Sequence, residues 1–308
     1  MSRIAYAKTP APTSGNWRFA LLAGVAAIFG LTAESRDVAA AESTAAAAAV
    51  ASAASESDVL RICATADGLP FSARDGSGFE NKIGSVVAEA MGRRPVFIWS
   101  DKPGIYLVRD YLDKNACDVI VGADTGDERV LTTKPYYRAG YVFVSRADSH
   151  LDVTSWDDPK IHKLGHIVIP FGSPAETMLK TIGRYEVEIS YLYSLVGFKS
   201  PRNQYVQIPS SRMAQEVAGG NADLAVAFAP EIARYVKSSS IPLQMTVVAD
   251  DSARADGMKV PEHFNQSMAV RKGDDALLAD LNSALDKAQP QIEAILKEEG
   301  VPLLRADE

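Results

Sequence analysis

The stretch "ADGLPFSARDGSGFENKI", residues 66–83, contains the local pattern from which the fold can be worked out. An apolar run, residues 59–65, precedes it, a Pro-Phe pair and a glycine-rich turn follow, and an amphipathic helix pattern begins at its end. A buried strand that passes through such a turn into a helix is typical of the mouth of a small-molecule pocket. The pattern therefore raises the question of whether the chain binds a solute there.

Length and composition indicate a globular protein. The chain has 308 residues, which is enough for two ordinary domains. Its content of 47% hydrophobic and 23% charged residues is ordinary for a soluble fold. The formal net charge of −7 argues against a nucleic-acid surface, which needs a clustered basic stripe, and leaves basic partners open.

The first 57 residues are predicted to precede the fold. Basic residues come before the apolar run "FALLAGVAAIFGL", residues 19–31, and small residues follow it, so residues 1–41 are interpreted as a secretory signal peptide. Cleavage near Ala41 or at Ala33 fits the small-residue rule, and an uncleaved membrane anchor is the alternative. Residues 42–57 form an Ala/Ser-rich tract, interpreted as a tether.

If the chain is exported, its two cysteines reach an oxidising compartment, where disulfides form. Cys63 lies in the apolar run "VLRICATA" and Cys117 opens "CDVIVG". If the two strands are neighbours in a parallel sheet, the residues come within bridging range, and one disulfide is the simplest prediction in an oxidising compartment. Two buried free thiols are the alternative.

The rest of the chain alternates short buried strands with helical patterns, which predicts an α/β architecture with mainly parallel sheets. Helices are expected over residues 80–92, 104–116 and 210–218, and over a long terminal region that bends or breaks near Pro290. The expected strands are residues 59–65, 95–99, 117–122, 141–145, 166–170, 205–209, 223–228, 245–249 and 267–271.

The order of these units predicts two lobes joined by two crossings. Lobe one is expected to comprise residues 58–145 and 268–308, because the last helices have no new strands to cover and return to the first domain. Lobe two is expected over residues 146–267. A hinged pair of lobes encloses a cleft, the usual place for a ligand.

Several motifs in this order resemble those of the periplasmic solute-binding proteins, in the branch that includes polar amino-acid binders. They are "LPF…GFENKI", "CDVIVG", "KPYYRAGYVFV", "GSPAE", "GGNADLAVAF" and "MAVRKGDDALLADLNSALDKA", and they span about residues 59–304. The resemblance implies the type II two-lobed fold and a periplasmic location.

A narrower resemblance is carried by "CATADGLPFSARDGSGFENKI", "TTKPYYR-x-x-YVFV", "FAPEIARY" and "IEAILKEEGVPLL". These segments are similar to the J accessory component of bacterial methanol oxidation systems. The resemblance implies a non-catalytic role in assembly, maturation or activation of a methanol dehydrogenase, with that enzyme and its cytochrome c as partners. The cofactor pyrroloquinoline quinone (PQQ) would belong to the dehydrogenase, and this chain would bind none.

Two departures weaken the expectation of amino-acid binding. In amino-acid binders an Arg before the Pro-Tyr pair grips the ligand carboxylate, and Arg129 precedes the pair here in a segment that looks shortened. The ligand ammonium usually meets an Asp at the position that Phe228 occupies. An apolar ring cannot neutralise a buried ammonium.

The candidate cleft residues include aromatic side chains, and their positions near strand ends fit core residues as well as residues that line a cleft. At Gly172 and Ser173 a helix begins, and "SPAE" is typical of a capped N-terminus whose free N–H groups could instead hold an anion. His162 and His166 have a metal-like spacing that Gly165 interrupts, so no metal site is expected. The full set predicted to line the cleft is Phe71, Phe79, Arg129, Tyr136, Tyr137, Gly172, Ser173 and Phe228.

The insertion "TIGRYEVEISYLYSLVGFKSPRN", residues 181–203, is rich in aromatic and basic residues. Tyr and Arg are enriched among interface hot spots, so a partner-docking surface is predicted at Tyr185, Tyr191, Tyr193 and Phe198. The alternative is a long loop or hairpin packed on lobe two.

Two other functions remain open at this point. One is a small-solute receptor of an ABC transporter. The other is an enzyme on the same scaffold, which needs a cleft carboxylic acid with a raised pKa; Glu80 is the nearest candidate, although it begins a helix and suits the helix dipole.

Overall fold

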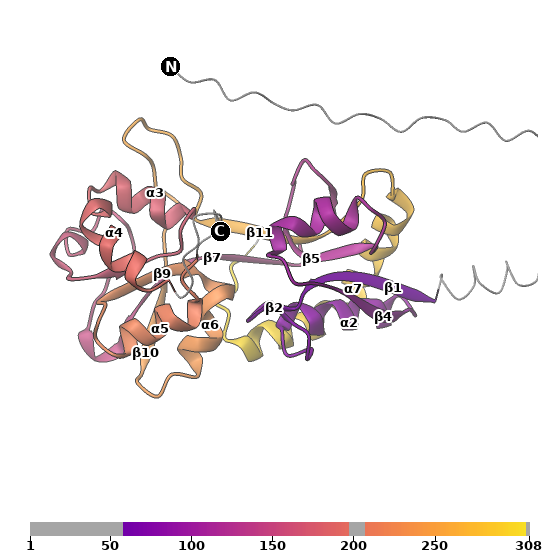
Figure 1. Cartoon of the computed structure of the whole chain (residues 1–308), viewed down its shortest axis with the longest axis horizontal. Helices are drawn as coiled ribbons and strands as arrows, with labels where there is room; N and C mark the ends of the chain where they lie inside the picture. Colours follow the sequence, from indigo (N-terminus) through magenta and orange to yellow (C-terminus); the bar gives the residue numbers. More distant parts are fainter. Residues whose placement is uncertain (1–57, 197–206, 306–308) are drawn as a thin grey trace, which may run out of the picture. The chain divides into compact units, whose positions relative to one another are not determined.

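The computed structural model describes residues 58–196 and 207–305, which belong to one compact unit (Figure 1). The predicted signal peptide, the predicted tether and Phe198 lie outside the described residues. The strands are β1 (Val59–Thr65), β2 (Asp67–Gly68), β3 (Ser72–Ala73), β4 (Arg94–Ser100), β5 (Val119–Asp124), β6 (Leu131–Thr132), β7 (Tyr137–Arg146), β8 (Ile167–Val168), β9 (Leu224–Phe228), β10 (Leu243–Val247) and β11 (His263–Val270).

The α-helices are α2 (Phe79–Ala90), α3 (Pro174–Thr181), α4 (Tyr185–Ser194), α5 (Ser210–Ala218), α6 (Ala229–Lys237) and α7 (Asp275–Glu299). Short helical turns occupy η1 (Gly104–Tyr106), η2 (Val108–Leu112), η3 (Ala147–Ser149) and η4 (Ile161–Lys163). Among the described residues, no helix has both the length and the apolar composition that a membrane span needs.

The strands of the described chain pair in the order β4-β1-β5-β11-β7-β9-β8, with β10 beside β7 and β6 beside β11. Pairing is parallel at both ends of this path, where β1 lies between β4 and β5 and where β8 joins β9. It is antiparallel through β11 and β7, which connect the two parallel groups. The sheet is thus mixed, with β-α-β units on either side of two long connecting strands.

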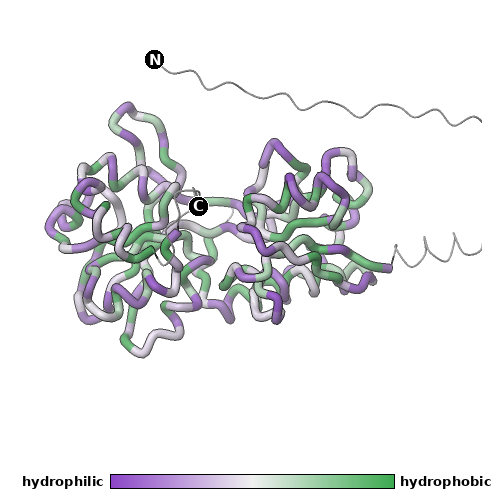
Figure 2. The backbone as a smooth tube through the Cα atoms, viewed as in Figure 1, coloured by the Kyte–Doolittle hydropathy of each residue, from purple (hydrophilic) through white to green (hydrophobic). Residues whose placement is uncertain are grey.

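Two hydrophobic cores lie on either side of these connecting strands. One core packs β1, β5, α2 and α7 together, and the other packs β7, β8 and β9 with α3, α5 and α6. In Figure 2 the hydrophobic colour follows the strands of both groups, whereas the turns are mostly hydrophilic. The two separate cores confirm the predicted two-lobed α/β arrangement. Phe228 and Met245 pack against both cores.

Most predicted strands are confirmed within a few residues. The strand predicted over residues 59–65 coincides with β1, in which buried and partly buried residues alternate before a fully buried centre. The strand predicted over residues 205–209 is wrong for Gln207, Ile208 and Pro209, which have no strand pairing in the described chain. Residues 205–206 lie outside the described part.

Three helix expectations need correction. The helix expected over residues 104–116 is replaced by the turn η1 and the wider π-helical turn η2. The loop or hairpin considered for the insertion is wrong over Tyr185–Ser194, which form α4. The terminal helix was expected to bend or break near Pro290, and it does not break there: α7 continues through the proline, although a proline cannot donate to the carbonyl four residues earlier.

Candidate functional site

The quoted stretch 66–83 is held by buried side-chain hydrogen bonds. Asn81, in the first turn of α2, accepts from the backbone N–H of Ala73 at 2.9 Å and donates to Ser72 Oγ at 3.0 Å. Ser72 Oγ in turn donates to the carbonyl of Thr65 at 2.8 Å, at the end of β1. These contacts fix the turn between β1 and α2 because three buried polar groups satisfy one another.

The two phenylalanines of this stretch differ in burial. Phe79 is completely buried in the core of the first lobe, and Phe71 is partly buried with its ring centroid 5.2 Å from that of Phe79. Neither residue lines the pocket described below. The structure therefore places both as core residues under the turn, which was the alternative considered for the aromatic side chains.

Glu80 occupies a confined position beside β5. Gly122 has a φ of +76°, and a Cβ there would lie 1.7 Å from Glu80 Oε1. Burial raises the pKa of Glu80 from its ordinary value of 4.5 to about 8. Tyr136 and Tyr137 are buried in the adjoining core, and burial raises the pKa of each hydroxyl well above its ordinary value.

A pocket of about 430 Å³ lies where strands of both lobes meet. Its lining comprises Asp124, Tyr141, Pro174, Phe228, Glu231, Pro261 and Phe264. Three of these residues form a ring cluster, in which the centroids of Tyr141, Phe228 and Phe264 are 5.8–6.2 Å apart. This size is within the range of small-molecule sites.

Glu231 was not identified from the sequence. It lies in the first turn of α6, three residues after Phe228, and its side chain reaches the same pocket. Burial alone raises its pKa from 4.5 to about 7. Its position after "FAP" at a helix start was the available signal, but the pocket membership depends on strands far away in the chain.

The predicted ligand-gripping arginine points elsewhere. Arg129 is exposed and binds Asp127, donating from Nε to Oδ1 at 3.0 Å and from Nη2 to Oδ2 at 2.6 Å. It is not among the lining residues of the pocket. Phe228, by contrast, lies at the end of β9 and lines the pocket.

The N-terminus of α3 is a capped helix start. Ser173 Oγ accepts from the backbone N–H of Glu176 at 3.2 Å, and the Glu176 carboxylate accepts from the N–H of Gly172. The arrangement resembles a capping box, except that Glu176 accepts from Gly172 and not from the N-cap residue Ser173, and Pro174 stands at the first helical position. Because the chain's own side chains bind these donors, Gly172 and Ser173 are explained by capping.

The surface of α4 combines exposed and anchored aromatic side chains. Tyr193 is 46% exposed, and its ring lies 5.1 Å from Phe171, while Val187, six residues earlier on the same helix, is 65% exposed. Tyr191 instead stacks on His166 at 4.1 Å and donates to the buried Glu216 at 2.8 Å. The insertion thus presents apolar groups on a helix whose inner face is fixed.

His166 takes part in an ion-pair cluster. Its Nδ1 lies 2.9 Å from the buried carboxylate of Glu188, which also binds Arg184 one helical turn away. His162 is four residues earlier and lies in η4. In the described part of the chain, no group of three or more His, Cys, Asp or Glu side chains is placed to hold a metal ion.

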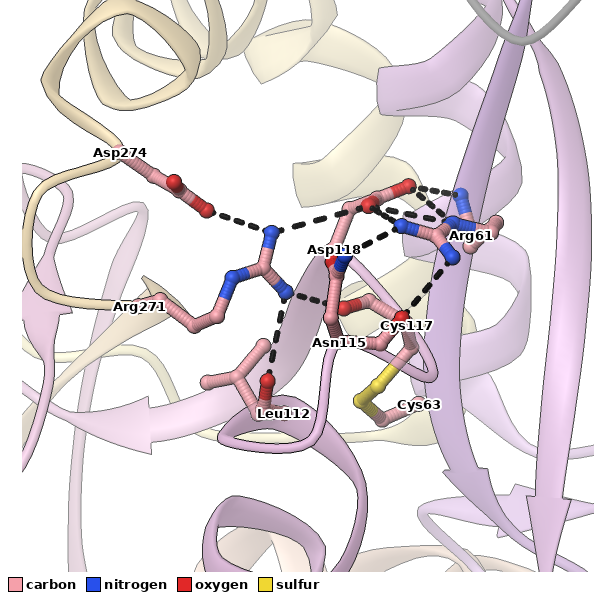
Figure 3. The surroundings of a disulfide bond; sticks show 8 residues. All are labelled: Arg61, Cys63, Leu112, Asn115, Cys117, Asp118, Arg271 and Asp274. Carbon is pink, nitrogen blue, oxygen red and sulfur yellow. Dashed lines mark hydrogen bonds and ion pairs between the residues drawn. A yellow bond between two sulfur atoms is a disulfide. The ribbon is translucent and has the colours of Figure 1, made fainter.

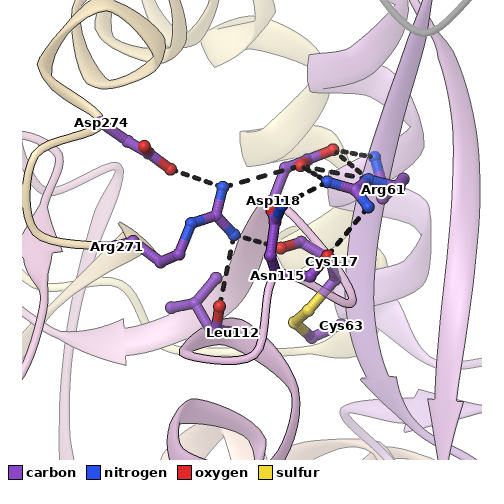
Figure 4. Close-up of polar contacts among 8 residues, drawn as sticks. All are labelled: Arg61, Cys63, Leu112, Asn115, Cys117, Asp118, Arg271 and Asp274. Atoms are coloured by element: carbon purple, nitrogen blue, oxygen red, sulfur yellow. Dashed lines mark hydrogen bonds and ion pairs between the residues drawn. A yellow bond between two sulfur atoms is a disulfide. The ribbon is translucent and has the colours of Figure 1, made fainter.

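A larger hollow of about 650 Å³ lies on the first lobe, beside the disulfide. The predicted Cys63–Cys117 bond is present, with a Cα–Cα distance of 5.5 Å (Figure 3). Arg61 donates from Nε to Asp118 at 3.1 Å, and Arg271 pairs with Asp274 at 2.6 Å (Figure 4). Because these charges satisfy one another, the hollow is interpreted as structural.

Residues 60–298 match the family model of the bacterial extracellular solute-binding proteins, family 3. The chain belongs to family 3 of the bacterial extracellular solute-binding proteins. This membership confirms the resemblance noted from the motifs, together with the two-lobed α/β fold expected from it.

Within family 3, the chain is 53% identical to Protein MoxJ of Methylorubrum extorquens, over 92% of this chain and 94% of that protein. It is 47% identical to Protein MoxJ of Paracoccus denitrificans, over 80% of this chain and 89% of that protein. The crystal structure of MxaJ from Methlophaga aminisulfidivorans covers 80% of this chain and 100% of its own, with 47% identity and a TM-score of 0.76. The narrower resemblance to the J component is thereby confirmed.

Proposed function

We propose that this protein is a non-catalytic periplasmic accessory protein of PQQ-dependent methanol oxidation. It binds methanol dehydrogenase and assists its assembly, maturation or activation, and the dehydrogenase's cytochrome c is a further candidate partner. The quinone cofactor resides in the dehydrogenase, and this chain carries no cofactor of its own. The predicted signal peptide directs the chain to the periplasm, where such dehydrogenases act.

The observation that carries the proposal is the similarity to the MoxJ proteins along almost the whole chain. At 53% identity over 92% of the chain, the two proteins share the body of the fold and not only one motif. The motif run quoted for the J component lies within this similarity, from the turn 66–83 to the C-terminal helix.

The pocket supports an accessory role over amino-acid transport. Amino-acid receptors need a cation for the ligand carboxylate and an anion at the position of Phe228. Arg129 is bound to Asp127 outside the pocket, and Phe228 presents an apolar ring to it. Among the described residues, the pocket thus lacks the cation that grips the carboxylate of a zwitterion.

The exposed face of α4 is the proposed docking surface for the dehydrogenase. Tyr193 and Val187 are unusually exposed for apolar side chains, and Tyr185 is partly buried with Lys180 Nζ 4.5 Å from its ring centroid. Exposed aromatic groups on a rigid helix lose little conformational entropy on binding, which favours a protein interface.

A deletion strain tests the function. Loss of the gene is expected to lower assembled, active methanol dehydrogenase in the periplasm, and the wild-type gene is expected to restore it. A gene carrying Tyr193→Ala and Val187→Ser is expected to restore it poorly, whereas Glu89→Gln on the exposed side of α2 is expected to restore it fully. Normal dehydrogenase activity in the deletion strain contradicts the proposed function.

The pocket itself favours a second candidate function, a small-solute receptor of an ABC transporter. Its volume of about 430 Å³ is large enough for a metabolite. In that case, native mass spectrometry of protein purified from the periplasm shows a stoichiometric small molecule. Deletion then impairs uptake of that solute and leaves dehydrogenase assembly intact.

A further inference from the structure

Three aromatic side chains line the pocket between β7, β11 and α6. Tyr141 of β7 lies 5.8 Å from Phe228 and 6.2 Å from Phe264 of β11, and the two phenylalanine rings are 6.0 Å apart and perpendicular. The three rings therefore form one aromatic cluster that lines the pocket. Such ring clusters attract cations through the ring quadrupoles.

The charged groups at this pocket are carboxylates. Asp124 and Glu231 both line it, and together with the nearby Glu262 they raise the pKa of the Tyr141 hydroxyl, with burial as the largest cause.

Neither of these carboxylates has a cationic partner among the described residues. Asp124 accepts one hydrogen bond from the amide of Gln266 at 2.7 Å, and Glu231 makes no hydrogen bond or ion pair with the described residues. Among the described residues, no lysine, arginine or histidine lines the pocket. Asp124 is exposed, whereas Glu231 is partly buried and unpaired among the described residues, and an incoming cation would offset the desolvation cost of the Glu231 carboxylate.

We propose that this pocket binds an organic cation, either a substituted ammonium or a guanidinium group, that carries no carboxylate of its own. The cation lies among the rings of Tyr141, Phe228 and Phe264, with Glu231 and Asp124 as its counter-ions. Glu231 supplies the negative charge that Phe228 cannot supply. The cation comes from a free amine or from a lysine or arginine side chain of a partner protein, and the inference does not depend on which protein this chain assists.

Among the described residues, no cationic side chain lines this site to bind a ligand carboxylate, which distinguishes it from the site of an amino-acid receptor. A zwitterion would bring its carboxylate close to Asp124 and Glu231, where like charges repel. Agmatine, which is arginine without its carboxylate, should therefore bind more tightly than arginine. A receptor for the amino acid would show the opposite order.

Isothermal titration calorimetry of the mature protein tests the inference. Agmatine is expected to bind with a Kd below about 1 mM, and arginine about tenfold or more weakly because of the repelled carboxylate. Glu231→Gln and Phe228→Ala are each expected to weaken agmatine binding about tenfold or more. The control Glu89→Gln replaces an exposed carboxylate on α2 and should leave the affinity unchanged. Circular dichroism verifies that each variant is folded.

The peptide acetyl-Gly-Arg-Gly-amide distinguishes the two sources of the cation. Tighter binding of the peptide than of agmatine assigns the pocket to a side chain of a partner protein, and the reverse order assigns it to a free amine. The inference is overturned if neither probe binds at about 10 mM, if arginine binds more tightly than agmatine, or if folded Glu231→Gln binds agmatine as well as the wild type does.

Discussion

Arg234 of α6 and Glu299 at the end of α7 form a two-point ion pair that joins the two hydrophobic cores. Arg234 Nε lies 2.6 Å from Glu299 Oε2, and Nη2 lies 2.8 Å from Oε1. The same Nη2 donates to the carbonyl of Ser77, just before α2, at 2.9 Å. One guanidinium group thus connects α6 of the second lobe with α7 and the turn 66–83 of the first.

Breaking this pair should destabilise the protein more than breaking a surface pair does. Glu299 is 6% exposed, so Arg234→Ala leaves a largely buried carboxylate with only Lys82 at 3.9 Å. We expect the free energy of unfolding to fall by about 1–3 kcal/mol. Urea denaturation measures the change. The exposed pair of Arg93 and Asp280 is the control, and Arg93→Ala should cost less than about 1 kcal/mol. Equal losses in both variants would show that the ion pair between the cores stabilises the protein no more than a surface pair does.

Reduction of the Cys63–Cys117 bond should also lower stability. The bond closes a loop with a sequence separation of 54, and both residues are buried. Removing the cross-link frees the unfolded chain, so the free energy of unfolding should fall by about 2–4 kcal/mol. Denaturation with and without reductant measures this loss. The double variant Cys63→Ala, Cys117→Ala should be as unstable as the reduced protein and should not respond to reductant.

Local patterns in the sequence were sufficient for much of the fold. The apolar run "VLRICAT" identified β1, and the Ser-Pro-x-Glu spacing identified the cap of α3, because both signals act within a few residues. The helix α4 was not foreseen, since "EVEISYLYS" mixes β-branched and aromatic residues that suit a strand equally well. Its buried Glu188 is stabilised by Arg184 and His166, and the second of these partners comes from outside the helix.

The pocket could be predicted only in part. Phe228 was identified because it ends a strand at a position where related receptors carry an acid. Glu231 was missed because its role depends on β5, β7 and β11 converging beside α6, and these strands are spread from Val119 to Val270. Arg129 had the expected residue type but binds a neighbour two residues away, a local contact that competes with any ligand.

The raised pKa of Glu80 gives a prediction of pH dependence. The unfolded chain loses this proton near pH 4.5, whereas the folded protein keeps it until about pH 8. The folded state therefore binds the proton more tightly, and stability falls as the pH rises from about 4.5 to about 8. Glu80→Gln removes this loss. We expect the free energy of unfolding of the variant, relative to that of the wild type, to rise between pH 5 and pH 8.5. The rise should be on the order of 1–2 kcal/mol, reduced for solvent screening, which corresponds to about 2–8 °C in Tm.

Thermal denaturation of both proteins at the two pH values measures this gain. Glu89→Gln, which replaces an exposed carboxylate on the same helix, should show the same difference from the wild type at both pH values. A Glu80→Gln variant whose Tm difference from the wild type does not change with pH would mean that Glu80 titrates normally in the folded protein.

Gly122 should tolerate substitution less well than other glycines of similar backbone conformation. Gly122 and Gly76 have φ values of +76° and +77°, so alanine costs about 1–2 kcal/mol of backbone strain at either position. Only at Gly122 does the added methyl group meet another group, the Glu80 carboxylate at 1.7 Å, whereas nothing lies within 4 Å at Gly76. Gly122→Ala should therefore lower the free energy of unfolding well beyond the loss for Gly76→Ala.

A double-mutant cycle isolates the contact between these two residues. In a Glu80→Ala background the carboxylate is gone, so the cost of Gly122→Ala should fall to that of Gly76→Ala, while the cost of Gly76→Ala itself should not change. Urea denaturation of the six proteins gives the coupling energy. If Gly122→Ala costs the same with and without the Glu80 side chain, the close approach of Glu80 to β5 does not exist in solution. The confined position that raises its pKa would then be ruled out as well.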